Sequence, residues 1–468
     1  MARSAHPAGS RHADGQRGAE RSDAPVDVTA LDPLVWPVTA ERVNGRLTLG
    51  GASVVDLVSQ FGTPLMLMDE QDLRERARQF VEAFAGNEVY YAGKAFLCTQ
   101  LARWIAEDGL GLDVCTAGEM AVALAADFPP ERMALHGNNK SVAELTSAVH
   151  AGVGTVVIDS FEEIERLSTL CDAGGVRQRV MVRVTVGVEA HTHEYIATAH
   201  EDQKFGFSLA SGDAFRAIGQ ILASGSLDLI GLHSHIGSQI FDTAGFEVSA
   251  RRIVGLLAQI RDEHGVELPV IDLGGGFGIA YRDGDEPQAP KEIAGRLRSI
   301  VEQDCAEQSL ALPLIAVEPG RAIVGPSTVT VYEVGTVKPV EVDGGTVRTY
   351  VSVDGGMSDN IRTALYGADY TVALVNRVSA APAARVRIVG KHCESGDIVV
   401  RDAWLPGDIE AGDLIAVAAT GAYCRSMASN YNFVTRPPVV AVRNGETQVM
   451  VRRETIQDLL ALDAGVHE

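Results

Sequence analysis

Residues 270–278 read VIDLGGGFG, a short run of apolar and β-branched residues that ends in consecutive glycines. Such a run predicts a buried strand followed by a tight turn. Similar runs recur along the chain, separated by stretches rich in Ala, Leu, Glu and Arg with apolar residues at helical spacing. They are NEVYYAGKA (87–95), GLDVCTAG (111–118), MALHGNN (133–139), TVVIDS (155–160), RVMVRVTV (179–186), LIGLHSHIGSQ (229–239) and LIAVEPGR (314–321).

Strands that alternate with helices form right-handed βαβ units and a parallel sheet. Eight such units predict an α/β fold with a (β/α)8 TIM barrel over residues 65–326, and an open doubly wound sheet is the alternative. The chain after residue 326 is β-rich and predicts a mostly antiparallel β-sandwich or barrel-like domain. The hairpin-like VNGRLTLGG (43–51) is expected to pair into it, which makes the β domain discontinuous, residues 26–64 and 327–468.

The composition of the 468 residues narrows the function classes. Hydrophobic residues make up 46% and charged residues 22%, which is typical of a globular chain with a large core. The net charge of −22 argues against nucleic acid or an anionic membrane surface as the main partner. The 6 cysteines form no C-x-x-C pair, which fits a reducing cytoplasm. No apolar run approaches the roughly 18 residues of a membrane span. Residues 1–25 are expected to form a disordered tail.

Residues with reactive side chains fall at the C-terminal ends of the predicted strands, where barrel enzymes build their sites. Lys94 follows the first strand, where a lysine can form a Schiff base or simply lie in solvent. Gly274–Gly276 allow backbone N–H groups to approach a phosphate, or form only a tight turn. Glu318 and Arg321 could be a structural ion pair. Alternatively, the acid holds a proton on a heterocyclic nitrogen while the arginine binds an oxyanion.

His233 and His235 alternate along one predicted strand, so their side chains share a face. They could ligate a metal, as in metal-dependent amidohydrolases, although those enzymes usually carry this pair on the first strand rather than the sixth. Alternatively, one imidazole stacks on an aromatic cofactor. A lysine, a glycine turn, an acid and a histidine together fit pyridoxal 5′-phosphate, which needs a covalent anchor, a phosphate cradle, a nitrogen partner and a ring stack.

Ten strings carry a resemblance to a known family: YYAGKA, DVCTAGE, HGNNKS, KFGF, HSHIGSQ, LGGGFG, EPGR, SDNIRTALYGA, HCESGD and GAYCRSMASNYN. From about residue 28 onward the chain resembles the diaminopimelate decarboxylase family, alanine-racemase-like barrel enzymes related to ornithine and arginine decarboxylases. The last three strings distinguish it from the polyamine-forming relatives. The resemblance implies pyridoxal-phosphate-dependent decarboxylation of meso-2,6-diaminopimelate, at its D-configured centre, to L-lysine and CO2, the last step of lysine biosynthesis.

The resemblance also assigns roles to individual residues. The cofactor-binding residues that it implies are Lys94, Asp113, His235, Ser238, Gly274, Gly275, Gly276, Glu318 and Tyr423. The substrate-binding residues are Arg321, Arg362, Tyr366, Glu394 and Tyr423. The catalytic residues are Lys94, Cys393 and Glu394. Cys393 and Glu394 are expected to come from the partner subunit of a homodimer. Cys393 is the favoured proton donor, with Lys94 as the second candidate.

Three positions depart from the family pattern. Thr363 replaces the more usual proline after Arg362, Ala199 replaces a glycine, and Gly93 replaces a larger apolar residue before Lys94. None removes a functional group, although Gly93 is expected to loosen the strand beside the lysine. A non-catalytic homologue would lack Lys94 or Cys393, and both are present. Racemases of the same fold carry an arginine where this chain has Glu318, which favours decarboxylation over racemisation.

Overall fold

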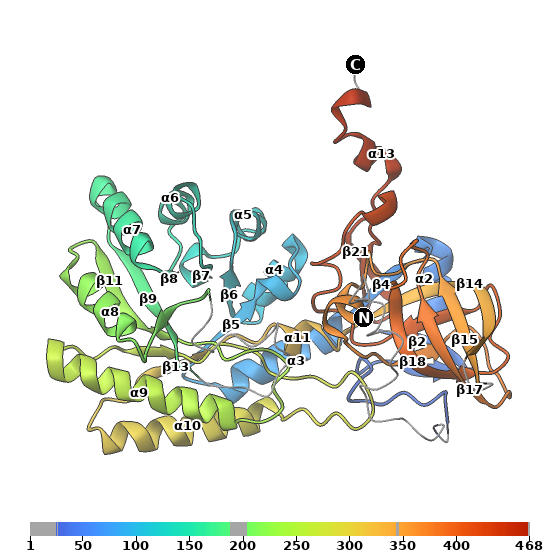
Figure 1. Ribbon diagram of the computed structural model, residues 1–468, viewed down its shortest axis with the longest axis horizontal. Coiled ribbons are helices and arrows are strands. Elements are labelled where there is room, and N and C mark those ends of the chain that lie inside the picture. The colour runs from blue at the N-terminus through green and yellow to red at the C-terminus, as the bar shows by residue number, and fades with distance from the viewer. Residues whose placement is uncertain (1–24, 26, 188–203, 343–345, 467–468) are drawn as a thin grey trace, which may run out of the picture. The chain divides into compact units, whose positions relative to one another are not determined.

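The computed structural model describes residues 25, 27–187, 204–342 and 346–466. The chain divides into two compact units (Figure 1). The barrel unit comprises Asp72–Ala280 and Asp285–Gly325, and the β unit comprises Met1–Gln71, Tyr281–Gly284 and Pro326–Glu468. The predicted disordered tail, residues 1–25, lies outside the described residues except for residue 25, and so does Ala199.

Within the described residues, the barrel unit is built on eight parallel strands, one from each of the predicted runs. They are β5 (Glu88–Ala92), β6 (Gly111–Val114), β7 (Met133–Leu135), β8 (Thr155–Ile158), β9 (Gln178–Thr185), β11 (Leu227–His233), β12 (Val270–Asp272) and β13 (Leu314–Val317). Each pairs with its neighbours, and the pairing of β13 with β5 completes the ring. The predicted closed (β/α)8 barrel is therefore confirmed, because an open sheet would leave two edge strands unpaired.

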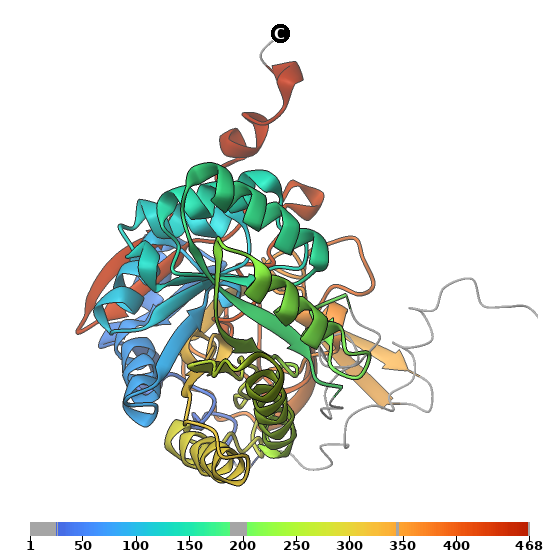
Figure 2. The ribbon, with the colours of Figure 1, turned by 90° about the vertical axis from the view of Figure 1, so that its left-hand side faces the viewer.

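Helices follow the strands and surround them, as Figure 2 shows. They are α4 (Thr99–Glu107), α5 (Ala117–Ala125), α6 (Val142–Ala151), α7 (Phe161–Gly174), α8 (Asp213–Ala223), α9 (Ala244–His264), α10 (Pro290–Glu307) and α11 (Arg321–Val324), with α3 (Glu70–Ala83) before β5. Local sequence sets several helix starts: Thr116 and Ser160 cap α5 and α7, and Ser141 forms a capping box with Glu144 at α6. No described helix is both long and apolar enough to cross a membrane.

Side chains from several strands fill the barrel interior. Val157, Met181, Ile230, Val270 and Ala316 form one buried cluster, although they come from five different strands. All eight strands run in the same direction, so their C-terminal ends gather at one end of the barrel. The polar residues that follow these strands are consequently brought together there.

The β unit contains a mixed sheet with long β14 (Thr328–Val342) at its centre. The other strands are β4 (Leu65–Asp69), β15 (Thr346–Val353), β16 (Val372–Leu374), β17 (Ala383–Val389), β18 (Ile398–Pro406), β19 (Leu414–Val417), β20 (Val439–Arg443) and β21 (Glu446–Val451). Most pairs are antiparallel, and the parallel ones are β15 with β17 and β4 with β20. This agrees with the predicted mostly antiparallel domain.

Two details of the β unit differ from the expectation. Residues 65–69 were expected to open the barrel, but they form β4, which pairs with β14 and β20 because these neighbours complete its hydrogen bonds. The VNGRLTLGG segment forms the predicted hairpin, yet β1 (Glu41–Val43), β2 (Arg46–Leu49) and β3 (Ala52–Ser53) make a small sheet of their own. The unit also includes the helices α2 (Val54–Phe61), α12 (Arg362–Tyr366) and α13 (Ile456–Leu460).

Candidate active site

Lys94 lies directly after β5, in the single helical turn Gly93–Ala95. Its side chain is exposed, whereas Gly93 and Ala95 are buried. A Cβ on Gly93 would lie 2.8 Å from the carbonyl oxygen of Asp113. The glycine therefore allows the ends of β5 and β6 to approach closely. This is tight packing at the lysine, and the expected loosening is not seen.

Glu318 follows β13 and is buried at the C-terminal end of the barrel, with 4% of its surface exposed. The Nε2 atoms of His233 and His136 lie 3.0 and 3.3 Å from the same carboxylate oxygen, Oε1. Burial lowers the pKa of each imidazole to about 4, so both are neutral at physiological pH. A neutral imidazole that carries its proton on Nε2 is attracted to Oε1 at these distances, although neither contact has the geometry of a full hydrogen bond.

The ionisation states of the neighbouring acids differ. Burial raises the pKa of Glu318, but His136, His233 and Lys94 outweigh that effect, so its pKa lies well below the usual range. Burial and the charge of Glu318 raise the pKa of both Asp113 and Asp272 well above the usual range. The environment thus favours the ionised form of Glu318 and disfavours that of Asp113 and Asp272. Glu318 is consequently the buried carboxylate at this end of the barrel that is best suited to meet a cationic group.

A buried lysine binds the backbone next to His136. Lys140 donates to the carbonyl oxygens of Gly137 and Val157, at 2.8 and 2.6 Å, and to Glu163 Oε1 at 2.7 Å. These contacts use all three of its N–H groups, which is the condition under which a buried ammonium group is tolerated. Because Gly137 directly follows His136, the lysine joins the end of β7 to β8 and α7. We interpret Lys140 as structural support for the imidazole.

The glycine run after β12 packs against the backbone of neighbouring strands. A Cβ on Gly275 would lie 2.2 Å from the carbonyl oxygen of Glu318, and one on Gly276 would lie 2.1 Å from that of Gly237. Neither position has room for a side chain. The Gly275 N–H donates to His235 Nδ1 at 3.2 Å, which leaves the proton of a neutral imidazole on Nε2. Burial holds the pKa of His235 well below its usual value, so this neutral form prevails.

Ser238 and Arg321 are joined by a hydrogen bond. Arg321 Nη2 donates to Ser238 Oγ at 2.9 Å, and the arginine is 8% exposed. The sequence assigned the serine to a phosphate and the arginine to a substrate carboxylate. The geometry places both side chains together in the barrel unit.

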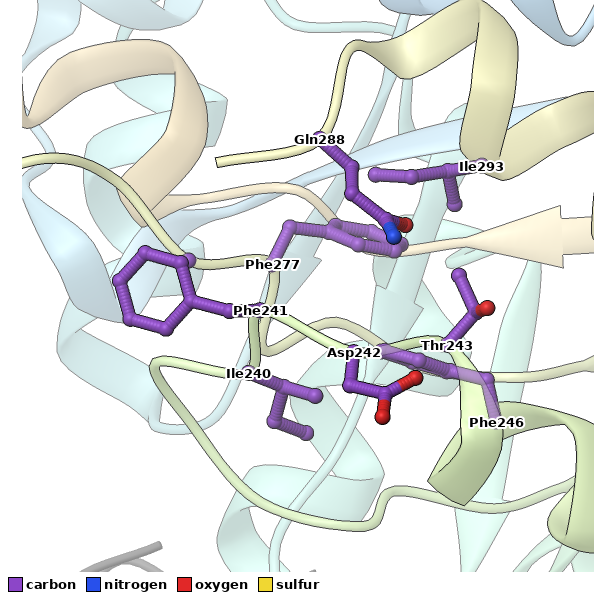
Figure 3. A pocket seen from close by; sticks show the side chains of 9 residues that line it. Ile240, Phe241, Asp242, Thr243, Phe246, Phe277, Gln288 and Ile293 are labelled. Carbon is purple, nitrogen blue, oxygen red and sulfur yellow. The ribbon is translucent and has the colours of Figure 1, made fainter. Parts of the chain in front are cut away.

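A small pocket lies beside this region without including it (Figure 3). It is lined by Ile240, Phe241, Asp242, Thr243, Phe246, Phe277, Gly278, Gln288 and Ile293. Phe277 stacks on Phe246 with ring centroids 5.2 Å apart. None of the predicted cofactor residues lines this pocket. We interpret it as a packing gap behind the glycine run, because its lining is dominated by aromatic and aliphatic side chains.

Arg362 and Tyr366 lie in the β unit, one helical turn apart on α12, so they share a face. Arg362 is 6% exposed, donates from Nη1 to the Tyr370 hydroxyl at 2.5 Å and lies 4.9 Å from the ring centroid of Tyr281. The adjacent Thr363 donates its hydroxyl to the Val399 carbonyl at 2.8 Å. A proline at this position could not make that bond. The departure from the family pattern therefore supplies a tie between α12 and β18.

The other predicted residues of the β unit lie on loops. Cys393 and Glu394 are exposed neighbours between β17 and β18. Tyr423 is partly buried and has a positive φ of 62°, an uncommon conformation for a tyrosine. These three residues belong to the β unit and form no part of the cluster around Glu318 described above.

Sequence reasoning missed His136, Asp272 and Lys140. His136 and Asp272 each occupy the end of a barrel strand, in MALHGNN and VIDLGGG, so position in the fold was the available signal. Lys140 lies in HGNNKS, one of the strings that carry the resemblance, but no role was assigned to it.

The residues that could hold a metal in the structure differ from the pair that the sequence suggested. The predicted pair was His233 and His235, but the close group is His136, His233 and Glu318, whose ligand atoms lie within 4.8 Å of one another. His235 instead accepts a hydrogen bond from the glycine run. The same distances are explained by two imidazoles that contact one carboxylate without a metal, and relatedness to known proteins decides between these interpretations.

Residues 70–325 match the family model described as "Pyridoxal-dependent decarboxylase, pyridoxal binding domain", which covers more than half of the chain. A diaminopimelate decarboxylase from Mycobacterium leprae is 56% identical, over 98% of this chain and 99% of its own. The chain belongs to the diaminopimelate decarboxylase family. A member from Bacillus subtilis is 47% identical, over 90% of this chain and 96% of its own.

Solved structures agree with this membership. A diaminopimelate decarboxylase from M. jannaschii, solved in complex with L-lysine, has a TM-score of 0.85 and 30% identity, covering 91% of this chain and 98% of its own. One from Helicobacter pylori, also with L-lysine, has a TM-score of 0.80 and 28% identity, covering 88% of this chain and 99% of its own. As a member of a pyridoxal-dependent family, the chain uses pyridoxal 5′-phosphate. The residues present fit it, because the glycine run excludes side chains and Glu318 keeps one buried charge.

Proposed function

We propose that this chain decarboxylates meso-2,6-diaminopimelate at its D-configured centre and releases L-lysine and CO2, the last step of lysine biosynthesis. Membership of the diaminopimelate decarboxylase family supports the substrate and the reaction. The observation that carries the chemistry is the buried, ionised Glu318, to which His136 and His233 present their Nε2 atoms.

The barrel unit supplies the residues that would hold the cofactor. Pyridoxal 5′-phosphate, when bound, supplies the electron sink that stabilises the negative charge left on the α-carbon as CO2 departs. In this proposal Glu318 keeps a proton on the ring nitrogen, and Lys94 anchors the cofactor covalently. His235 lies against the ring, while Ser238 and Gly274–Gly276 bind the phosphate. Asp113 and Tyr423 complete the cofactor-binding set.

Binding of the distal end of the substrate is assigned to Arg321, Arg362 and Tyr366. A guanidinium group can bind a carboxylate through two parallel N–H groups, and the phenol adds a third donor. A substrate held at its far end keeps the breaking bond in one orientation, which removes part of the entropic barrier. Glu394, with Tyr423, is proposed to complete the substrate-binding set.

The α-carbon must receive a proton after the C–CO2 bond breaks. The electron pair of that bond remains with the carbon, and we assign delivery of the proton to the thiol of Cys393. The resulting thiolate recovers a proton from solvent, which balances the reaction as loss of CO2 and gain of one proton. Lys94 is the second candidate donor.

A homodimer completes this proposal, with Cys393 and Glu394 supplied by the partner subunit. Their exposure on a loop of the β unit supports a role outside their own fold core. The proposed location is the cytoplasm, because none of the cysteines in the described chain forms a disulfide.

The proposed function is tested by incubating the purified, pyridoxal-phosphate-loaded protein with meso-2,6-diaminopimelate and measuring CO2 and L-lysine. We expect equal amounts of the two products and little turnover of L-ornithine, L-arginine or LL-2,6-diaminopimelate. Release of agmatine or putrescine at comparable rates would contradict the substrate assignment. Interconversion of stereoisomers without CO2 would contradict the reaction type.

A further inference from the structure

His392, which directly precedes Cys393, connects loops of the β unit that are far apart in the sequence. Its imidazole is buried, with 8% of the residue exposed. Nε2 lies 2.8 Å from Ser358 Oγ, and Nδ1 lies 3.0 Å from Asn432 Oδ1. The ring also stacks on Tyr431, with centroids 5.2 Å apart and an interplanar angle of 28°. One side chain therefore joins the SDN, HCESGD and SNYN segments.

The hydrogen bonds from His392 to Ser358 and Asn432 can form in either protonation state of the ring. Asn432 Oδ1 is an acceptor, so Nδ1 of His392 must donate its N–H to it. The Ser358 hydroxyl donates to Nε2 when the imidazole is neutral and accepts from it when the imidazole is protonated. Both hydrogen bonds are consequently available to the neutral and the charged ring.

The backbone of the same loop is fixed by Asp397. Its carboxylate accepts the N–H of His392 at 2.7 Å and the N–H of Met357 at 2.6 Å. Gly390 packs over this carboxylate, since a Cβ there would lie 2.3 Å from Asp397 Oδ2. The Ser429 N–H also donates to the carbonyl of Ser358 at 2.8 Å. The base of the loop is therefore held at both backbone and side chain.

The tip of the loop is exposed to solvent, in contrast to its buried base. Cys393, Glu394 and Ser395 are all exposed, between the buried His392 and the buried Asp397. An exposed tip of this kind keeps a defined position only if its base is rigid. His392 supplies contacts to two other segments at that base, and its ring nitrogens are directed to Ser358 and Asn432 rather than to Cys393 or Glu394.

We propose that His392 is a positioning residue, which holds the Cys393–Glu394 loop in place by joining it to Ser358 and Asn432. The inference rests on the proposed function, in which Cys393 delivers the proton. Displacement of a reacting group by about 1 Å can cost about 100-fold in rate, so a residue that orders this loop affects turnover without touching substrate.

The holding role is tested by hydrogen exchange in the pyridoxal-phosphate-loaded enzyme. In His392→Ala we expect the amides of residues 391–397 to exchange about tenfold faster or more, with partial rescue in His392→Gln, whose amide can both donate and accept. The matched control is His264→Ala, which removes another histidine stacked on an aromatic ring, that of Phe215. Unchanged exchange over 391–397 in His392→Ala would overturn the proposal.

A double variant tests whether His392 affects turnover through Cys393. We expect His392→Ala to lower kcat about 10- to 100-fold in the wild-type background and to cause no further loss in Cys393→Ala. An equal loss in both backgrounds would overturn the positioning role, because it would indicate a general structural effect. Full turnover by Cys393→Ala alone would contradict the proposed function instead, and the exchange measurement would still decide whether His392 holds the loop.

Discussion

At the scale of single residues, the site depends on how a fully buried carboxylate stays ionised. Burial of an ionised carboxylate costs several kcal/mol even after relaxation. The Nε2 atoms of His136 and His233, 3.3 and 3.0 Å from Oε1, and the positive charge of Lys94 oppose this cost and hold the pKa of Glu318 well below its usual range. Burial and the charge of Glu318 raise the pKa of both Asp113 and Asp272 well above the usual range, which disfavours competing negative charges beside it.

This balance predicts a change in the pH dependence of His233→Leu. Loss of one N–H donor raises the pKa of Glu318, so the carboxylate becomes protonated at a higher pH. We expect the acid limb of kcat, measured between about pH 5 and 8, to move to higher pH. His233→Gln is the matched control, because its amide can still donate and should restore much of the wild-type profile. An identical acid limb in His233→Leu and wild type would show that the imidazole does not hold Glu318 ionised.

At the scale of elements, the turn after β12 is specified by the absence of side chains. The backbone of Gly275 approaches the carbonyl of Glu318 so closely that only hydrogen fits. In the proposed function, this turn would form the phosphate cradle and would also set the position of Glu318, which is assigned to the cofactor nitrogen. A substitution in this turn should therefore weaken cofactor binding more than it lowers the stability of the fold.

We accordingly expect Gly275→Ala to weaken pyridoxal 5′-phosphate binding by about tenfold or more, because the new methyl group must displace the backbone at Glu318. The measurement is a titration of the apoenzyme followed by absorbance. Gly295→Ala is the control, since Gly295 lies in α10 and a Cβ added there would meet no described atom within 4 Å beyond its own helix backbone and chain neighbours. Equal affinities in Gly275→Ala and Gly295→Ala would contradict the role of the turn.

The elements also show where sequence reasoning succeeds. Each barrel strand was predicted because a run such as TVVIDS is apolar, short and followed by turn residues. The barrel was predicted to begin at residue 65, which wrongly included LMLMD (65–69), because this apolar segment fits a barrel or a mixed sheet and only its partners β14 and β20 decide. His136 escaped notice for a related reason. Its role comes from contact with Glu318, which lies far along the chain, and periodicity cannot reveal such a contact.

At the scale of the whole molecule, the net charge of −22 opposes the approach of an anionic cofactor. In the proposed function, Lys94, Arg321 and backbone N–H groups of the barrel would attract it locally. The β-unit residues are assigned to this site on the basis of the family resemblance, because their motifs match the family. Composition and periodicity gave no information about these residues.

The proposed homodimer predicts complementation between inactive subunits. Lys94→Ala and Cys393→Ala each damage a different half of a shared site. Random mixing would place the two variants together in about half of the dimers, each with one native site, so about a quarter of wild-type activity should return. Activity is measured after unfolding and refolding the mixture, with each variant treated alone as the control. No recovery in the mixture would contradict a site shared between subunits.

The most direct test of the central claim, that Lys94 anchors the cofactor in this barrel, is borohydride reduction of the purified enzyme followed by peptide mapping. We predict a near-visible absorption band that disappears on reduction and a pyridoxyl group attached to Lys94. Lys94→Ala should lack both. A pyridoxyl group on any other lysine, or a wild-type enzyme without the band after incubation with pyridoxal 5′-phosphate, would contradict the account.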